Sequence, residues 1–354
     1  MPATRRRKAR LAWLVILVAT AYSHSAAGLE ARRDTISVGP GESVQAAIDA
    51  AIDGDVIELA AGEYTERIDF RGKEIRVVGV GDATVIRGMG RGPVVRFSNR
   101  EGPGSVLDSV VITGGIAKRG GGIYIRNASP TVVRTLVARN RAESQGSAIY
   151  IGGKANPLIY NNLIIYNTNN GRGDPHAVEI VGASPWVINN TIARSDSNGL
   201  ISRGGAPIIR NNLLAWNGTQ VGGNRRGRGI CDFSDRLASI HYNGFHRNTI
   251  AAILRDGRDW KKVRHLQNQR PDERVQCNID GNPRFARRPP ANADSASYGD
   301  FELAGAGKAL DRGDPIAACN DHDGTRNDLG FTGGPFAAGT AEIPTAGACG
   351  TGPS

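Results

Sequence analysis

A repeated apolar segment is the feature of this sequence that most constrains its fold. Four segments begin with a small residue and proline and continue with short β-branched runs. They are SPTVVRTLVARN at Ser129, NPLIYNNLIIYN at Asn156, SPWVINNTIARS at Ser184 and APIIRNNLLAWN at Ala206. Their prolines, at positions 130, 157, 185 and 207, give a period of 22 to 28 residues. Such a period, with almost no helical periodicity, predicts that each unit is one coil of a β-solenoid.

Positions inside the repeat stay in register although its length varies, so we expect the extra residues to fall at one corner of each coil. Apolar residues recur two and seven positions after the prolines: Val132, Ile159, Val187 and Ile209, then Val137, Ile164, Ile192 and Leu214. Because a single coil cannot bury its apolar face, these residues are predicted to stack in files about 4.8 Å apart. Asparagine pairs recur at 161–162, 189–190 and 211–212. They suit the bends, because asparagine tolerates left-handed backbone angles and can pass hydrogen bonds between copies.

The segment ahead of the strands predicts a helix. ESVQAAIDAAIDGD, residues 42–55, carries apolar residues at helical spacing behind Ser43, which suits an N-cap. We expect this helix to cover the N-terminal end of the stack, where unpaired strand edges otherwise favour aggregation. An ordinary surface helix is the alternative.

The first 27 residues have the pattern of a secretory signal peptide. A basic stretch is followed by the apolar run LAWLVILVA and by small residues that suit cleavage near Ala27. The run is too short to span a bilayer, and no second stretch of about 18 apolar residues follows, so we expect no transmembrane anchor. The mature protein is predicted to be soluble and secreted or periplasmic.

Charge and cysteine content restrict the partners and the chemistry. The net charge is +10, of which five basic and no acidic residues in the signal segment supply half. Scattered arginines and 6% aromatic residues are not typical of nucleic-acid binders, whereas mild basicity permits an acidic partner. The four cysteines, Cys231, Cys277, Cys319 and Cys349, suggest disulfides in an exported protein, with sequential pairing favoured among three possible pairings. No C-x-x-C occurs, which disfavours zinc.

Several stretches resemble the right-handed parallel β-helix proteins of the pectin-lyase-like superfamily, of the exported bacterial type. The stretches are ESVQAAIDAAIDGDVIELAAGEYTERIDFRGKEIRVVG, GGGIYIRNASPTVVRTLVARN, CNIDGNPRF, YGDFELAGAGKALDRGDP and NDHDGTRNDLGFTGGP. The resemblance covers roughly residues 36–336 and implies an all-β, right-handed parallel β-helix with an N-terminal helical cap. We expect a signal peptide (1–27), a cap (28–54), the β-helix (55–336) with an irregular insertion (232–280), and a loose tail (337–354). We also expect a monomer.

Two longer loops are expected to protrude from one corner of the stack, about 10 Å apart, and to flank a groove. They are TNNGRGDPHA in the second unit and TQVGGNRRGRG in the fourth. The predicted groove residues are Arg172, Asp174 and His176 from one loop, Arg225, Arg226 and Arg228 from the other, and Tyr124, Tyr150 and Glu179 facing outward from adjoining strands. Aromatic and charged side chains on an extended face suit a sugar polymer.

Asp174 and His176 are the predicted catalytic residues. An imidazole titrates near neutral pH, and a nearby carboxylate can orient it as an acid or base. Asp-Pro-His at 174–176 also resembles the core motif of alginate C5-epimerases, which implies His176 as the base and Asp174 as its helper. Gly171 stands where that motif has a tyrosine, and Tyr150 on the preceding coil is a candidate replacement. The structural alternative is a proline-initiated turn with a solvated histidine.

The arginine loop predicts an acidic substrate, because guanidinium groups neutralise uronate carboxylates and thereby ease proton abstraction beside them. A flexible, solvated loop is the alternative. We therefore expect an exported, carbohydrate-active protein that works on an acidic polysaccharide as a lyase or C5-epimerase. The second hypothesis is a non-catalytic glycan-binding or structural envelope protein with the same face.

The metal requirement stays open. Asp321, Asp323 and Asp328, with Asn320 and Asn327, offer the hard oxygen ligands that calcium prefers. The same side chains also suit a capping turn built from Asx hydrogen bonds.

Overall fold

The computed structural model describes residues 34–169, 176–218, 227–235, 237–271, 274–287, 289, 301–305, 307–316 and 320–334. The chain divides into two units, Met1–Asp34 and Thr35–Ser354. All described residues except Asp34 belong to the second unit.

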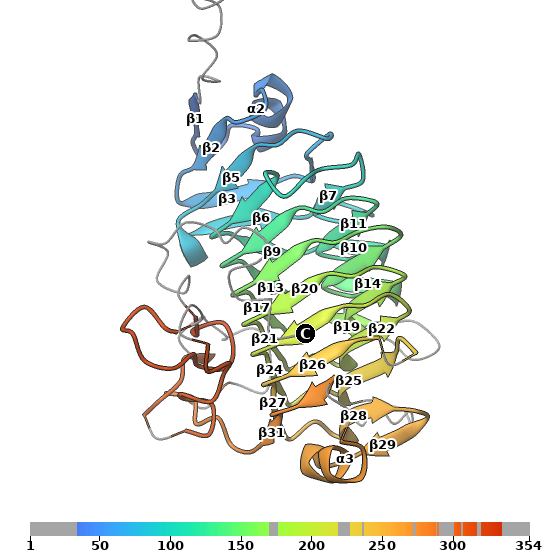
Figure 1. Ribbon diagram of the computed structural model, residues 1–354. Helices are drawn as coiled ribbons and strands as arrows, with labels where there is room; N and C mark the ends of the chain where they lie inside the picture. Colours follow the sequence, from blue (N-terminus) through green and yellow to red (C-terminus); the bar gives the residue numbers. More distant parts are fainter. Residues whose placement is uncertain are drawn as a thin grey trace, which may run out of the picture. The chain divides into compact units, whose positions relative to one another are not determined.

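Three parallel sheets, A, B and C, form the successive sides of a coil, and a small sheet D accompanies them (Figure 1). Sheet A contains, in spatial order, β1 (Thr35–Val38), β2 (Val56–Leu59), β5 (Arg76–Val78), β8 (Val106–Asp108), β12 (Thr131–Val133), β16 (Leu158–Tyr160), β20 (Trp186–Ile188), β23 (Ile208–Arg210), β26 (Ser239–His241) and β30 (Val275–Gln276). Sheet B contains β3 (Gly62–Thr65), β6 (Thr84–Arg87), β9 (Val111–Thr113), β13 (Leu136–Ala138), β17 (Leu163–Ile165), β21 (Thr191–Ala193), β24 (Leu213–Ala215), β27 (Gly244–His246) and β31 (Ile279–Asp280). A 3-10 turn, η1 (Gly81–Ala83), precedes β6.

Sheet C carries the face on which the candidate site lies. It contains β4 (Ile68–Asp69), β7 (Val95–Phe97), β11 (Ile123–Arg126), β15 (Ile149–Gly152), β19 (His176–Val181), β22 (Asn198–Arg203), β25 (Arg228–Phe233), β28 (Ala251–Arg255) and β29 (Arg258–Trp260). Sheet D contains β10 (Ile116–Arg119), β14 (Arg141–Gln145) and β18 (Thr168–Asn169). Each coil passes through sheets A, B and C in turn, so a strand pairs in parallel with its equivalent one coil later. The predicted all-β parallel β-helix is therefore confirmed.

The predicted apolar files form the core. Val132, Ile159, Val187 and Ile209 are consecutive partners in sheet A, and each is completely buried. The equivalent file in sheet B runs through Val137, Ile164, Ile192 and Leu214. Burying one side chain of this size stabilises the fold by roughly 1.5–3 kcal/mol, so the stacked files supply the main driving force for coil formation.

Asparagine ladders hold the bends between the sheets. Between sheets A and B, the amide Nδ2 of each of four asparagines donates to the Oδ1 of the next at 2.9–3.0 Å, through Asn162, Asn190, Asn212, Asn243 and Asn278. At the corner after sheet B, Asn140 donates to Asn167 at 3.2 Å and Asn217 to Asn248 at 3.1 Å. The buried ladder amides also donate to backbone carbonyls of neighbouring coils, so each donor of these amides has a partner within the stack.

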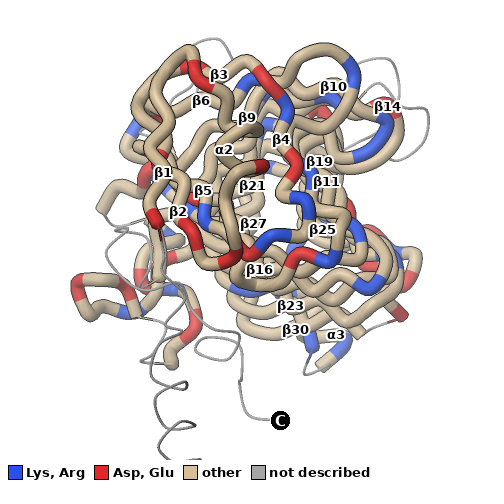
Figure 2. The backbone as a smooth tube through the Cα atoms, turned by 90° about the horizontal axis from the view of Figure 1, so that it is seen from above, with Lys and Arg blue, Asp and Glu red and all other residues tan. Residues whose placement is uncertain are grey.

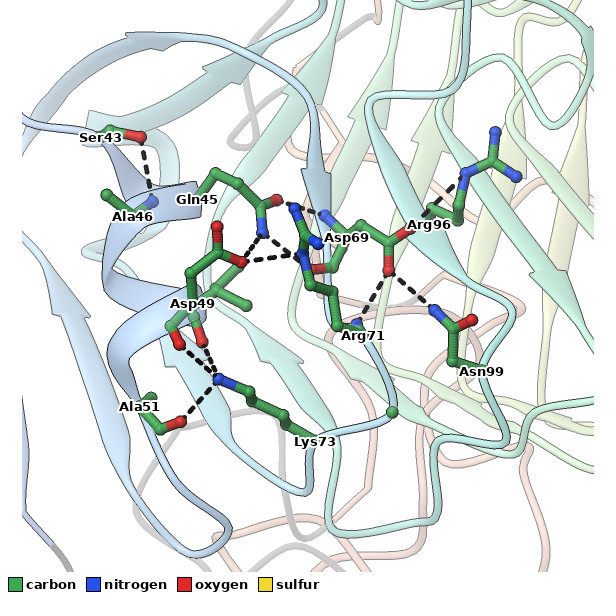
Figure 3. Close-up of polar contacts among 12 residues, drawn as sticks. Ser43, Gln45, Ala46, Asp49, Ala51, Asp69, Arg71, Lys73, Arg96 and Asn99 are labelled. Carbon is green, nitrogen blue, oxygen red and sulfur yellow. Dashed lines mark hydrogen bonds and ion pairs between the residues drawn. The ribbon is translucent and has the colours of Figure 1, made fainter.

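The predicted helix, α2 (Val44–Ala50), lies across the N-terminal end of the coil, as Figures 1 and 2 both show. The Ser43 hydroxyl accepts a hydrogen bond from the Ala46 amide at 3.1 Å, which confirms the N-cap. At the other end, Lys73 Nζ donates to the carbonyl oxygens of Ile48, Asp49 and Ala51 at 2.7 Å each (Figure 3). A cation there satisfies free carbonyl groups and complements the helix dipole.

Residues 232–280 differ from the irregular insertion that the sequence led us to expect. Among the described residues of this range, β26, β27, β28, β30 and β31 continue sheets A, B and C in register. The strand β29, which pairs antiparallel with β28, and the helix α3 (Val263–Gln269) depart from the coil. The reason is that Ile240, Phe245 and Ile253 fill the core positions of one more coil, which lacks the proline that marks the earlier repeats.

The C-terminal segment returns along the outside of the coil. The first asparagine of each pair has a positive φ, between 52° and 57°, and its side chain points away from the core to hold this segment. Asn161 Nδ2 donates to the carbonyls of Phe331 and Gly333, and Asn189 Nδ2 donates to Asn327 Oδ1 at 2.8 Å. A buried ion pair between Arg210 and Asp314, 2.6 Å apart, adds a charged anchor.

The expected disulfide between Cys231 and Cys277 is not present. Cys231 is buried on β25, where it packs with Ile201 and Leu254 on the outer face of sheet C. Cys277 is exposed at the turn that joins sheets A and B, so the two residues lie at different sides of the coil. Cys319, Cys349 and the predicted signal peptide lie outside the described residues. No helix in the described part of the chain is long and apolar enough to cross a membrane.

Candidate functional site: a basic groove between sheets C and D

The outer face of sheet C meets sheet D in a groove, which we call the C–D groove. Its floor is a file of outward-facing residues in register across four strands: Arg96, Tyr124, Tyr150 and Glu179. The side wall is formed by β10 and β14. The pocket at its N-terminal part has a volume of about 560 Å³ and is lined by Tyr124, by the acidic Glu143 and by four basic residues, Arg91, Arg96, Lys118 and Arg119. Tyr150 and Glu179 continue the file beyond this pocket. Figure 2 shows Lys and Arg positions along β10 and β14.

Strand alternation and a glycine turn position these side chains. Ile123 and Ile125 point into the core, and Tyr124 between them points outward. Gly120 and Gly146, with φ of 61° and 58°, each directly follow a strand of sheet D. Glycine adopts this left-handed conformation without steric cost, so the chain turns directly from sheet D into sheet C. The turn places both sheets in the same groove.

Two stacked tyrosine rings, each with an arginine beside it, form the middle of the floor. The rings of Tyr124 and Tyr150 stack with their centroids 5.4 Å apart and an interplanar angle of 12°. The Arg96 guanidinium lies 5.3 Å from the Tyr124 centroid, and that of Arg119 lies 5.4 Å from the Tyr150 centroid. Arg96 also lies 3.9 Å from Asp69 beside the N-terminal cap (Figure 3). Cation–π contacts of this kind hold guanidinium groups in place while they stay open to anions.

The Tyr150 side chain is 5% exposed, and its hydroxyl forms no hydrogen bond with another described residue, so it is free to bond a ligand that reaches it. Burial of the ring raises the pKa of Tyr150, and the positive charges of Arg119 and Arg126 act in the opposite direction. The phenol therefore carries its proton at neutral pH and can donate it.

Glu179, the next residue in this file, is almost completely buried, with 1% of its surface exposed. Its Oε1 accepts hydrogen bonds from Gln145 Nε2 at 2.9 Å and from Arg203 Nε at 3.4 Å, whereas its Oε2 has no partner. Burial raises the pKa of Glu179, despite the opposing effects of Arg203 and Gln145. A carboxyl group with a raised pKa and an unused oxygen is typical of functional sites.

The structure brings together two of the predicted site residues and separates a third from them. Tyr150 and Glu179 are register partners in adjacent strands. His176, which begins β19, is completely buried, and its Nε2 lies 3.4 Å from Asn198 Nδ2. Its ring therefore has no exposed surface in the C–D groove. The catalytic role of His176 stays a prediction.

The predicted arginine wall can be described at one position. Arg228 in β25 forms a two-point ion pair with Asp259, at 2.5 Å and 3.0 Å. Its guanidinium is thus already engaged by a carboxylate. Arg172, Asp174, Arg225 and Arg226 lie outside the described residues, and their predicted roles stay predictions.

Sequence reasoning missed Arg119, Arg126, Arg203 and Gln145. A signal for two of them was present: Arg126 and Arg203 each stand two residues after an outward-facing position of a strand, so alternation also places them on the outer face. Arg119 and Gln145 end strands of sheet D, and nothing in the local sequence indicated that these strands return beside sheet C.

The acidic residues considered for calcium serve as hydrogen-bond acceptors in a turn. The Asp321 carboxylate accepts from the Asp328 amide at 3.1 Å, and Asp323 accepts from the Thr325 amide and hydroxyl at 2.9 and 2.7 Å. Within the described ranges, no group of three or more His, Cys, Asp or Glu residues could hold a metal ion.

Comparison with solved structures supports the fold: the chain has a parallel β-helix similar to that of a pectate lyase. It is similar to the pectate lyase Pel9A, with 13% identity and a TM-score of 0.50 over 84% of this chain and 96% of that one. It also matches an alginate lyase from Paenibacillus sp. str. FPU-7 (15% identity, TM-score 0.37, 62% and 90% covered). A mannuronic acid specific family 6 lyase from human gut microbiota matches with 16% identity, a TM-score of 0.35, and 62% and 61% covered. No protein-family model and no curated protein matches the chain.

Proposed function

We propose that the protein acts on an acidic polysaccharide bound in the C–D groove, as a lyase or a C5-epimerase. Both reactions begin with removal of the proton beside a uronate carboxylate, so the site must neutralise that carboxylate and supply a base and an acid. The guanidinium groups of Arg119, Arg126 and Arg203 surround Tyr150 and Glu179 and offer bidentate partners for carboxylates.

One observation carries the proposal. A protonated tyrosine hydroxyl and the unpartnered Oε2 of a buried glutamate belong to register partners on the same outer face, beside several arginines. Buried polar atoms without a partner are destabilising, and a protein tolerates such an atom most readily where a ligand completes its hydrogen bonds. A sugar hydroxyl or the C5–H group beside a uronate carboxylate fits this position.

In β-elimination, ionised Glu179 takes the C5 proton, and the released electron pair forms the C4–C5 double bond. The C4–O4 bond breaks, and Tyr150 gives its proton to the leaving O4. In epimerisation the same first step is followed by return of a proton to the opposite face of C5. The raised pKa of Glu179 makes its carboxylate a better base. The substrate must displace the side chains that cover Oε2, since Glu179 is 1% exposed.

The hypothesis that His176 is the base, with Asp174 as its helper, remains an alternative within this proposal. It requires that the His176 ring become exposed when substrate binds, because the ring is completely buried. We also propose that the protein is exported, because acidic polysaccharides occur outside the cell.

The test is an incubation of the purified protein with alginate, polygalacturonate and glycosaminoglycans, with and without calcium. Ultraviolet absorbance from new double bonds reports a lyase, and deuterium incorporation at C5 reports an epimerase. Glu179→Gln is expected to lower either signal at least 100-fold, whereas His176→Ala tests the alternative base. Lys154→Ala, an exposed residue outside the groove on the same coil as Tyr150, is the matched control. Full activity in the Glu179 variant would rule out the assignment of the base.

Non-catalytic glycan binding is the second candidate function. It is favoured by the burial of both proposed bases, Glu179 and His176, at 1% and 0% exposure. Binding to an acidic polymer that weakens in Arg119→Ala and with rising salt, without double bonds or C5 exchange in the wild type, would support this function.

A further inference from the structure

Gly152 ends β15, two residues after Tyr150, at a position where alternation places a side chain on the outer face of sheet C. Its register partners on the two neighbouring strands are Arg126 and Val181. A Cβ atom built on Gly152 would lie 2.7 Å from both Cε1 and Oη of Tyr150 and 2.9 Å from its Cζ. The phenol ring therefore lies over Gly152 and fills the space that a side chain there would occupy.

The backbone does not require glycine at this position. Gly152 has no positive φ, unlike Gly153, whose φ of 71° lies in the left-handed region. A Cβ on Gly153 would also approach Asn127 Oδ1 to 2.1 Å. Gly153 is thus explained by the turn that it forms, whereas Gly152 lies in extended strand that any residue can adopt. What excludes a side chain at Gly152 is the Tyr150 ring.

We propose that Gly152 is a positioning residue, which sets the Tyr150 hydroxyl above the strand between Arg126 and Val181. This inference rests on the proposed function. In that function Tyr150 is the proton donor, and Gly152 fixes the position of its hydroxyl relative to the bound uronate. With the ring lying over Gly152, the hydroxyl stays near Arg126, and the ring keeps its contacts with Tyr124 and Arg119.

A methyl group at this position would move the ring and leave the strand intact. The atoms that it would meet are at the far end of a side chain with two rotatable bonds, so the phenol can swing away without a backbone shift. A misplacement of about 1 Å between reacting groups lowers rates by as much as about 100-fold. Substrate binding through the arginines should change much less, because the three atoms nearest to the added methyl group all belong to Tyr150.

The experiment compares Gly152→Ala, Tyr150→Phe and the double variant on the polymer that the wild type turns over. We expect Gly152→Ala to lower kcat about 10- to 100-fold, with KM within about 3-fold of the wild type. The double variant should be no less active than Tyr150→Phe, because both changes act on one hydroxyl. Gly244→Ala in β27 is the matched control, since its Cβ would also meet only side-chain atoms, the nearest being Leu329 Cδ1 at 2.9 Å. This control should keep full activity.

A spectroscopic measurement separates positioning from folding and from the proposed function. In protein carrying ¹³Cζ-labelled tyrosine, the Tyr150 resonance, assigned with Tyr150→Phe, should shift in Gly152→Ala and titrate closer to the ordinary tyrosine pKa. If the wild type turns over no polymer, the proposed function fails, and this resonance alone decides the positioning role. An unchanged Tyr150 resonance, or a Gly152→Ala variant with wild-type kcat, overturns the inference.

Discussion

Protonation of Glu179, a single residue of the groove, affects the stability of the folded protein. Its carboxylate loses water on folding and regains two hydrogen bonds, both to Oε1. Burial raises its pKa above the usual value for glutamate, so the native state holds this proton more tightly than the unfolded state. The free energy of unfolding must then fall as the pH rises from the ordinary glutamate pKa through the raised one.

Glu179→Gln removes this penalty. We expect the variant to gain stability relative to the wild type at pH 8, and to gain less or nothing at pH 4, where the wild-type carboxyl is protonated. Thermal unfolding at both pH values measures the difference, and Glu58→Gln, at an exposed position of β2, serves as control. A variant that is less stable than the wild type at pH 8 would show that the hydrogen bonds of Glu179 outweigh its burial.

The sequence predicted some site residues and missed others for a physical reason. Alternation within a strand is local, so Tyr150 and Glu179 were correctly expected on the outer face. Arg119 reaches the Tyr150 ring from sheet D, and this proximity depends on the path of the chain between two sheets. His176 was assigned to a loop, but it begins β19 beside a neighbouring strand that buries it.

At the scale of elements, the asparagine ladder between sheets A and B is the device that keeps the coils in register. Asn190 occupies its middle. Its Nδ2 donates to the Ile159 carbonyl at 2.8 Å and to Asn212 Oδ1 at 3.0 Å, and its Oδ1 accepts from the Asn162 amide at 2.9 Å. Each of these partners is buried and loses a hydrogen bond when the Asn190 side chain is removed, although the Asn190 backbone amide still donates to Asn212 Oδ1 at 2.9 Å.

Asn190→Ala should therefore be strongly destabilising. Leaving one buried polar group without a partner costs about 1–3 kcal/mol, and this substitution removes a partner from several buried groups. We therefore expect a decrease of roughly 3–5 kcal/mol in the free energy of unfolding. Chemical denaturation measures it, with the exposed Asn156→Ala as a matched control that should change stability by less than about 0.5 kcal/mol. A loss below about 1 kcal/mol would mean that water or relaxed neighbours replace the ladder.

Elements with the repeated apolar pattern were predictable, and the others were not. The four proline-led units gave their strands and their register directly. Sheet D was missed because β10 and β14 carry mostly exposed polar residues, which lack the apolar alternation of a half-buried strand. The coil through β26 and β27 was expected to be irregular because it begins without proline, although Asn243 and Asn248 continue both ladders.

At the scale of the whole molecule, the returning C-terminal segment carries a pH dependence of its own. Burial and the neighbouring charges of Asp321, Asp311 and Asp323 raise the pKa of Asp328 to about 7, while a hydrogen bond from the Asp311 amide opposes the shift. An unfolded aspartate titrates near 3.9. Between these values the native segment holds a proton that the unfolded chain lacks, so its stability falls as the pH rises from about 4 to about 7.

Asp328→Asn should remove this dependence, because the amide keeps an oxygen that can accept from Asp311 and carries no charge. Hydrogen exchange of residues 307–334 at pH 4.5 and pH 8 is the measurement. We expect wild-type protection to be lower at pH 8, and the variant to be protected equally at both. Asp323→Asn is the contrasting control: hydrogen bonds from Thr325 lower the pKa of Asp323, so its loss should weaken the turn at pH 8. Equal wild-type protection at both pH values would contradict the prediction.

The ladder at the corner after sheet B has a consequence for how such a chain can diversify. Asn140, Asn167, Asn217 and Asn248 tie the neighbouring coils together immediately before the corner where the chain enters sheet D or crosses to sheet C. From Ser195 the chain reaches Leu200 at once, whereas from Asn140 it first builds β14. Each coil can therefore form whatever the length of the segment inserted at this corner. Segments grafted at this corner should change what the surface recognises while the stack beneath stays as it is.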